Sequence, residues 1–148
     1  MNKRPGKAGR RLASASTLVS SFLETADAVE ARLEAAVSPL GLSLAKLALL
    51  HQLAEAKEPL PLSELAQLQN CVRSNITQLV DRLEKEGLVR RRPDPADRRS
   101  VRAALTPAGQ QAYQKGKRAL AEEQQAIVRA LSTGEAASLT GVLEALGD

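Results

Sequence analysis

The apolar residues of this 148-residue chain depart from a helical spacing in only one place. Before about residue 87 and after about residue 106 they recur at steps of three and four, the repeat of an amphipathic α-helix. Over residues 88–105 they alternate with polar residues, which is the repeat of a half-buried strand. One short strand pair within a helical chain excludes a large sheet, so the predicted fold class is mostly α with a small β-hairpin.

Cap and turn residues divide the helical pattern into segments. Ser43 and the pair Thr106–Pro107 are suited to begin helices, and the segment Ser132–Glu135 has the spacing of a capping box. Gly87 is suited to the left-handed conformation that ends a helix. The pattern therefore predicts six helices, over about 12–37, 43–57, 62–69, 73–86, 107–131 and 132–148.

The strand pattern lies directly behind two closely spaced helices. The helices over 62–69 and 73–86, joined by a tight turn, have the geometry of a helix-turn-helix. Strands are predicted over 88–91 and 100–105, with a turn-rich loop between them. This hairpin would form a wing, so the sequence predicts a winged helix-turn-helix over about 43–105, flanked by long helices over about 12–37 and 107–148.

Positive charge is concentrated in two segments of the chain. The net charge of the whole chain is +4. Residues 1–11, predicted to be a disordered basic arm, carry +5, and residues 90–102 hold six arginines against two aspartates. An acidic body with two basic projections is typical of a protein that binds a polyanion. The alternatives are a tail that aids solubility and a solvated arginine-rich turn.

The composition excludes several classes of site. The chain has one cysteine, Cys71, and one histidine, His51, so an internal disulfide is impossible and a zinc site lacks ligands. No nucleophile motif surrounds His51 and no glycine-rich phosphate loop is present, so neither an enzyme nor a cofactor is expected. No stretch approaches 18 uncharged apolar residues, and no secretory signal is found. We therefore expect a cytoplasmic protein without a membrane partner.

A winged helix-turn-helix has a direct physical means of reading duplex DNA. The second helix of the pair fits the major groove, where its first residues reach the base edges. The narrow arginine-rich hairpin fits the adjacent minor groove, whose negative potential attracts arginine. A winged-helix module for protein interaction is the alternative class, but such a module needs neither an arginine-rich tip nor a polar start to the helix.

Four segments of the chain resemble the MarR family of bacterial transcriptional regulators. They are Leu65–Ala66, Asn75–Val89, Asp94–Arg99 with its Asp-Arg-Arg signature, and Leu105–Gly109. The resemblance implies a single MarR-like domain over 12–148 that binds pseudo-palindromic duplex DNA as a homodimer. It also implies a transcriptional regulator, with repression by promoter occlusion as the simplest mechanism, and release of DNA by a small organic acid as in many members.

The resemblance places the first set of DNA contacts on the recognition helix over 73–86. The side-chain amides of Asn75 and Gln78 are suited to the edge of adenine. Thr77 could face a phosphate or pack inward, and Arg82 could contact a phosphate or form a surface ion pair. The set of candidate contacts comprises Arg73, Ser74, Asn75, Thr77, Gln78 and Arg82.

The second set of contacts lies on the wing. The resemblance makes Arg99 the minor-groove residue and Arg98 its backbone or structural partner. Asp97 is expected to hold these guanidinium groups by a bidentate pair and so to support the wing. The three arginines at 90–92 alternate sides of a strand, so at most two of them face DNA together.

The long flanking helices carry more apolar positions than one stripe can bury in a monomer of this size. A homodimer would bury them, and it would match the two-fold symmetry of a palindromic site. The alternative is that they pack within one chain. The predicted interface comprises Leu12, Val19, Phe22, Val29, Ile127, Leu131, Leu139, Val142 and Leu146.

Three residues are candidates for a sensor. His51 and Arg32 are candidate residues of an effector pocket for a carboxylate, the alternative for His51 being an ordinary exposed or packed side chain. Cys71 precedes the recognition helix, where a helix N-terminus can lower the pKa of a thiol. A redox-responsive regulator is therefore an alternative, against the interpretation of Cys71 as a small buried hydrophobic residue.

Overall fold

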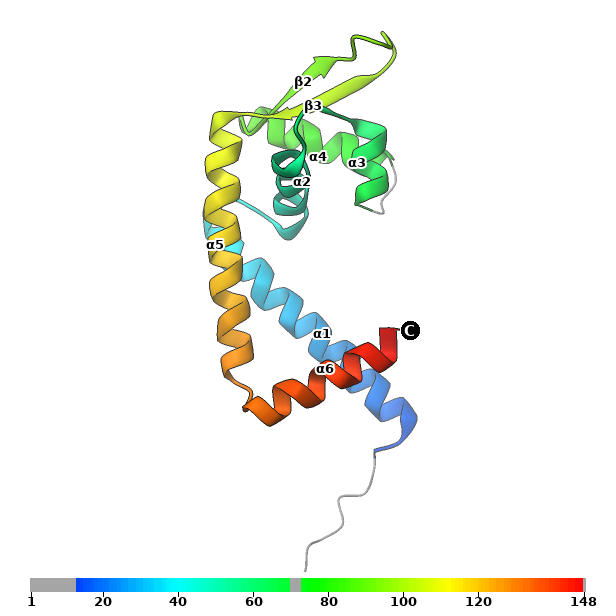
Figure 1. Cartoon of the computed structure of the whole chain (residues 1–148), viewed down its shortest axis with the longest axis vertical. Coiled ribbons are helices and arrows are strands. Elements are labelled where there is room, and N and C mark those ends of the chain that lie inside the picture. Colours follow the sequence, from blue (N-terminus) through cyan, green and yellow to red (C-terminus); the bar gives the residue numbers. More distant parts are fainter. Residues whose placement is uncertain (1–12, 70–72, 148) are drawn as a thin grey trace, which may run out of the picture.

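The computed structural model of the chain describes residues 13–69 and 73–147. A head formed by residues 44–105 lies at one end of the long helix over 107–129 (Figure 1). A stem formed by residues 15–37, the later part of the long helix and residues 133–147 lies at the other end. The elements in chain order are α1 (Ala15–Val37), a short 3-10 helix (Ser38–Leu40), α2 (Leu44–Glu55), β1 (Leu60–Pro61), α3 (Leu62–Leu68), α4 (Arg73–Lys85), β2 (Val89–Pro93), β3 (Val101–Leu105), α5 (Pro107–Arg129) and α6 (Thr133–Gly147). The mostly helical fold class with a small hairpin is confirmed.

The predicted caps form. The hydroxyl of Ser43 accepts a hydrogen bond from the backbone N–H of Lys46 at 3.1 Å, and that of Thr106 accepts one from Gly109 at 2.9 Å. Glu135 accepts from both the backbone N–H and the hydroxyl of Ser132, which completes the capping box. These contacts explain why the starts of α2, α5 and α6 could be predicted to within one residue.

The sheet has one strand more than the sequence predicted. Its order is β1-β3-β2, with both pairs antiparallel. β1 has only two residues, so it cannot show the alternation that identifies a strand. Its Pro61 lies at the sheet edge, where a missing N–H is tolerated. The turn after α4 is as expected, because Gly87 has φ +74°.

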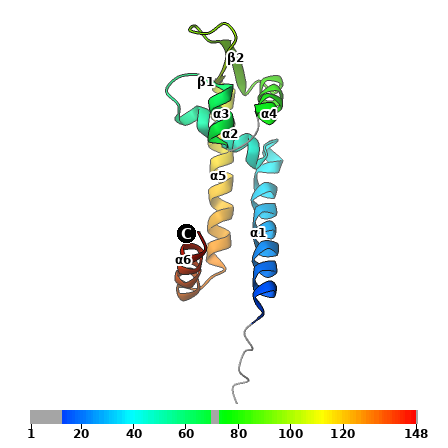
Figure 2. The same cartoon turned by 90° about the vertical axis from the view of Figure 1, so that its right-hand side faces the viewer.

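The hydrophobic core lies in the head, where α2 packs against α5, the sheet and α4. Leu49, Leu50, Leu65 and Leu83 are fully buried there. The stem is different, since Val37 is the one buried residue among the described part of α1, and α6 has none. Figure 2 shows α1 and α6 on opposite sides of α5, so these two helices do not cover each other's apolar residues.

The stem exposes most of the predicted interface. Val19 and Phe22 of α1 and Leu139, Val142 and Leu146 of α6 are exposed, while Val29, Ile127 and Leu131 are half-buried. Leu12, the arm over 1–11 and Cys71 lie outside the described residues.

A test for membrane-spanning helices identifies no single helix in the described part of the chain. The helical segments Ala15–Leu40 and Leu44–Glu55, with a bend of 73° between them, reach the length and hydropathy of a membrane span only when they are counted together.

Candidate nucleic-acid interface

Helix α4 presents a buried stripe and an exposed stripe. Ile76, Val80 and Leu83 are fully buried and hold the helix on the core. Asn75, Gln78 and Arg82, spaced at i, i+3 and i+7, are exposed and share one face. The exposed residues are three of the predicted DNA contacts, so the local fold leaves their side chains free to meet a ligand. The side chains of Arg73 and Ser74 lie outside the described part of the structure.

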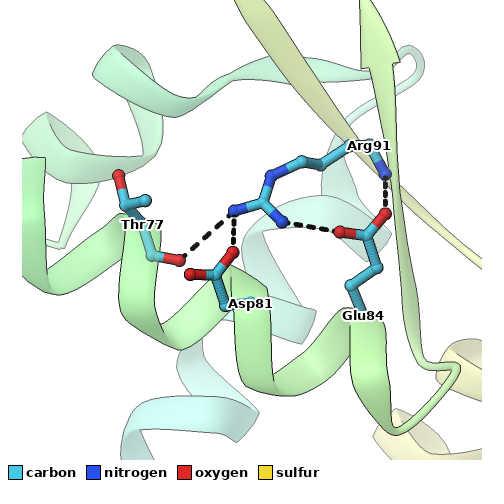
Figure 3. A network of polar contacts seen from close by, with 4 residues as sticks. All are labelled: Thr77, Asp81, Glu84 and Arg91. Carbon is cyan, nitrogen blue, oxygen red and sulfur yellow. Dashed lines mark hydrogen bonds and ion pairs between the residues drawn. The ribbon is translucent and has the colours of Figure 1, made fainter.

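A third stripe of α4 faces the wing. Arg91 of β2 extends its guanidinium over this stripe (Figure 3). Its Nη1 donates to Oε2 of Glu84 at 2.6 Å, and its Nη2 donates to a carboxylate oxygen of Asp81 and to the backbone carbonyl of Thr77 at 3.4 Å. The backbone N–H of Arg91 also donates to Glu84, at 3.2 Å. Thr77 therefore belongs to the wing-facing stripe through its backbone.

The contacts with Arg91 change the acidity of Glu84. The backbone N–H of Arg91 and then its guanidinium stabilise the carboxylate, so they hold the pKa of Glu84 below its ordinary value. The carboxylate therefore stays ionised in moderately acidic solution, and the link between β2 and α4 persists there.

The wing is braced by Asp94 and not by the expected side-chain pairs of Asp97. Asp94 is buried, and its carboxylate pairs with Nε of Arg102 at 3.0 Å. Asp97 instead accepts a hydrogen bond from the backbone N–H of Arg99 at 2.9 Å, and its carbonyl accepts from Ser100 at 3.0 Å. The expectation that Asp97 supports the wing by gripping guanidinium groups is therefore corrected: it shapes the turn through the backbone.

The short side chain of Asp97 explains why it bonds to the backbone of the loop. A short aspartate two residues before an N–H readily closes a local turn, whereas it cannot easily reach a long arginine beside it. The same kind of contact recurs at Asp94, whose Oδ1 accepts from the N–H of Ala96 at 2.9 Å. That N–H, with Arg102 as the second partner, lowers the pKa of Asp94.

The tip and rim of the wing expose their arginines. Arg98 and Arg99 at the tip are exposed, as are Arg90 and Arg92 on β2, while Arg91 turns toward α4. Arg91 thus differs from its two strand neighbours, as the alternation along a strand requires. Positive charge is therefore concentrated at the outer edge of the wing.

A cavity lies between the head and the stem. It has a volume of about 320 Å³ and is lined by Leu44, Leu47, Ala48, His51, Tyr113, Lys117 and Leu120. Nδ1 of His51 lies 2.8 Å from the hydroxyl of Tyr113, and Nζ of Lys117 lies 5.8 Å from the Tyr113 ring centre. The walls are almost entirely apolar, and the lining residues include Lys117 and the hydrogen-bonded pair of His51 and Tyr113.

The two residues predicted for the pocket, His51 and Arg32, lie at different places in the structure. His51 lines this cavity, and its part in an effector pocket stays a prediction. Arg32 does not line it, because its guanidinium pairs with Glu123 of α5 at 2.6 Å. Its place as a pocket residue is therefore corrected to a link between α1 and α5.

Several residues of the site were not identified from the sequence. Tyr113 and Lys117 lie 62 and more positions after His51, and no local motif joins them. The spacing of Asp81 and Glu84 indicated that they lie on one side of a helix, where both could contact the same partner. What the spacing could not provide was the strand that brings Arg91 to them.

Comparisons with known proteins bear on the same segment. The sequence model of the MarR family matches residues 42–101. A protein of Thauera aromatica named "Putative transcriptional regulatory protein for hcr operon" is 36% identical over 84 residues, which are 57% of this chain and 51% of that protein. The chain thus spans about half the length of this curated relative.

Solved structures match a larger part of the chain. AbsC, a MarR-family transcriptional regulator from Streptomyces coelicolor, has a TM-score of 0.76 at 23% identity over 93% of this chain and 95% of its own. A mutant MarR from E. coli, solved with operator DNA, has a TM-score of 0.74 at 24% identity over 88% and 93%. At such identities the likeness establishes the fold. Residues 42–101 thus match the MarR family in sequence, and the chain shares the winged-helix fold of these MarR structures.

Proposed function

We propose that this protein is a sequence-specific regulator of transcription that binds duplex DNA as a homodimer and represses by occluding the promoter. The observation that carries the proposal is the pairing of two surfaces on the head. The exposed stripe of α4 offers the amides of Asn75 and Gln78, and the wing beside it offers Arg98 and Arg99. Amides at a helix start suit base edges in the major groove, and arginines on a narrow hairpin suit the minor groove.

The stem supports the homodimer. Exposed apolar residues extend along α1, the end of α5 and α6, in a larger number than a monomer ordinarily leaves in water. A two-fold axis through this stem would present two heads to one face of DNA, about one helical turn, roughly 10 base pairs, apart. Association would therefore both bury the stem and set the spacing of the half-sites.

Selection from a pool of random duplexes tests the proposal. The full chain, in reducing buffer, is mixed with the pool at low salt, and the bound fraction is sequenced. We expect a two-fold symmetric motif. Salt-sensitive binding with no enriched motif would contradict sequence-specific regulation. An absence of binding at low salt would favour the protein-interaction module.

A small organic acid as effector is a further part of the proposal. The cavity between α2 and α5 has apolar walls for a ring and Lys117, with His51 and Tyr113, for a carboxylate. Because α2 belongs to the head and α5 continues into the stem, a ligand held here would change the angle between the two. Release of DNA would follow from a lost match to the half-site spacing.

Benzoate serves as the probe for this site. Calorimetric titration should show binding to the wild type and a loss of at least about tenfold in Lys117→Met, because the carboxylate loses its cation. Lys115→Met, which removes the same charge from an exposed position of α5, is the matched control. Equal binding by the two variants would exclude this cavity as the carboxylate site.

A further inference from the structure

Among the described residues, Arg91 makes the side-chain hydrogen bonds and ion pairs that join the wing to the recognition helix. Arg91 has both its guanidinium and its backbone N–H bonded to acceptors of α4, as Figure 3 shows. The side chain of Arg91 is only 27% exposed. Within the sheet, the register partner of Arg91 is Ala103 of β3, which is fully buried. The strand pairing thus fixes the backbone from which the guanidinium reaches α4.

The acceptors of Arg91 define how α4 is oriented. Thr77, Asp81 and Glu84 are spaced at i, i+4 and i+7, so they form a stripe along the helix. This stripe lies between the buried stripe and the exposed stripe of Asn75, Gln78 and Arg82. A rotation or a slide of α4 relative to β2 would break at least one of these bonds. The contacts therefore fix which side of α4 is presented outward beside the wing.

The two carboxylates are unfavourable for DNA binding in any other respect. Asp81 and Glu84 are partly exposed and lie next to a surface proposed to meet a polyanion. By Coulomb's law alone, removing two negative charges there would strengthen binding to every duplex. The ion pairs with Arg91 give these two carboxylates a structural role that offsets their repulsion of DNA phosphates.

We infer that Arg91, with Asp81 and Glu84, is a positioning set that makes the wing and the recognition helix one rigid reading unit. The inference rests on the proposed DNA binding and deepens it. A wing that is already placed relative to α4 meets the minor groove without a further ordering cost when α4 enters the major groove. Arg91 thus acts through Arg99 and Asn75, and its own contact with DNA is not required.

The variant Asp81→Asn/Glu84→Gln tests the inference because rigid reading and simple electrostatics predict opposite signs. Binding is measured to the selected duplex and to a random duplex. We expect affinity for the selected duplex to fall by about tenfold, the scale of coupling between contacting groups, while affinity for the random duplex stays or rises. Glu55→Gln/Glu64→Gln removes two exposed carboxylates from α2 and α3 and is the control, expected to lose nothing on either duplex. A rise on both duplexes in the first variant would overturn the inference.

Arg91→Lys provides the conservative comparison. Lysine keeps the charge but cannot donate in a planar fork to two carboxylates and a carbonyl at once. We expect the variant to lose affinity for the selected duplex and to keep the salt dependence of the wild type on the random duplex. Wild-type affinity for the selected duplex would show that Arg91 acts as a point charge, and the positioning role would be wrong.

A measurement without DNA separates this inference from the proposed function. Spin labels are placed at Ala96 in the wing loop and Lys85 at the end of α4, in a Cys71→Ser chain. We expect one narrow distance distribution, and a broad one after Asp81→Asn/Glu84→Gln. Narrow distributions in both proteins would overturn the inference whatever the DNA result. Broadening in a chain that selects no duplex would overturn the proposed function instead.

Discussion

The carboxylate of Glu34 in α1 accepts a hydrogen bond from the backbone N–H of Leu44, at 3.0 Å, across the junction of stem and head. The bond satisfies one of the free N–H groups in the first turn of α2. Lys46, two residues further along α2, donates to the carbonyl of Gly41 and pairs with Glu86, just after α4, at 2.6 Å. Polar contacts thus run from the stem through α2 to the end of the recognition helix. The orientation of each head on its stem is therefore specified by side chains.

Asn75→Ala is expected to weaken binding to the selected duplex by about 1–3 kcal/mol and to leave random DNA nearly unaffected. A side-chain amide that reads an adenine edge provides that much discrimination. Fluorescence anisotropy with the two duplexes measures both losses. Gln114→Ala, an exposed amide on α5, is the control. A loss of equal size on both duplexes would show that Asn75 does not read bases.

Arg99→Ala is expected to weaken binding to all duplexes and to lower the dependence of log K on log salt. Each neutralised phosphate of B-DNA contributes about 0.9 to that slope, because counterions are released. Titrations at several salt concentrations measure the slope. The same substitution at Arg118 on α5 controls for the loss of one positive charge. An unchanged affinity and slope would remove Arg99 from the interface.

Val142→Glu is expected to convert the proposed homodimer into a monomer while the head stays folded. Val142 is 51% exposed on α6, and a charge at the centre of an apolar interface would be buried without a partner. Leu68→Glu is the matched control, because Leu68 on α3 is 50% exposed but lies in the head. Light scattering after size exclusion reports the mass. A Val142→Glu dimer would contradict the proposed stem interface.

Gly109→Ala is expected to lower the free energy of unfolding by about 1–3 kcal/mol, the usual cost of overpacking. A Cβ at this position would meet the backbone oxygen of Leu88 at 2.0 Å, where only a shift of α5 makes room. Gly134→Ala serves as the comparison, since a Cβ there meets nothing within 4 Å. Urea unfolding measures both variants. Similar stabilities for the two would show that α5 does not pack closely on Leu88.

The stability that Glu84 provides is expected to depend on pH. Its pKa in the folded chain is lowered from 4.5, so its contribution is fully present above that value and is lost as the pH falls through the folded pKa. The difference in melting temperature between the wild type and Glu84→Gln should therefore shrink below about pH 4.5. Glu64→Gln, at an exposed position, gives the general effect of one lost charge. A difference that stays constant down to acid pH would contradict the ion pair with Arg91.

The helix ends could be predicted from the sequence because each capping interaction joins residues within one turn of the chain. Ser43, Thr106 and the Ser132–Glu135 box cap neighbouring N–H groups, and Gly87 needs only its own backbone freedom. The two-residue β1 escaped prediction because its pairing with β3 depends on residues some forty positions away. Apolar periodicity identified the recognition helix and its exposed stripe for the same reason that the caps were identified.

The amino-acid sequence by itself determined the helices, the hairpin, the arginine-rich tip and the excess of apolar residues in the stem, since these depend on short-range spacing and composition. The tertiary structure decided which charges meet. Arg91 pairs with Asp81 and Glu84, and Arg102 pairs with Asp94. Arg32 pairs with Glu123 and does not line the cavity, whereas Tyr113 and Lys117 line it together with His51. A long side chain has many partners within reach, and only the packing of distant elements selects among them.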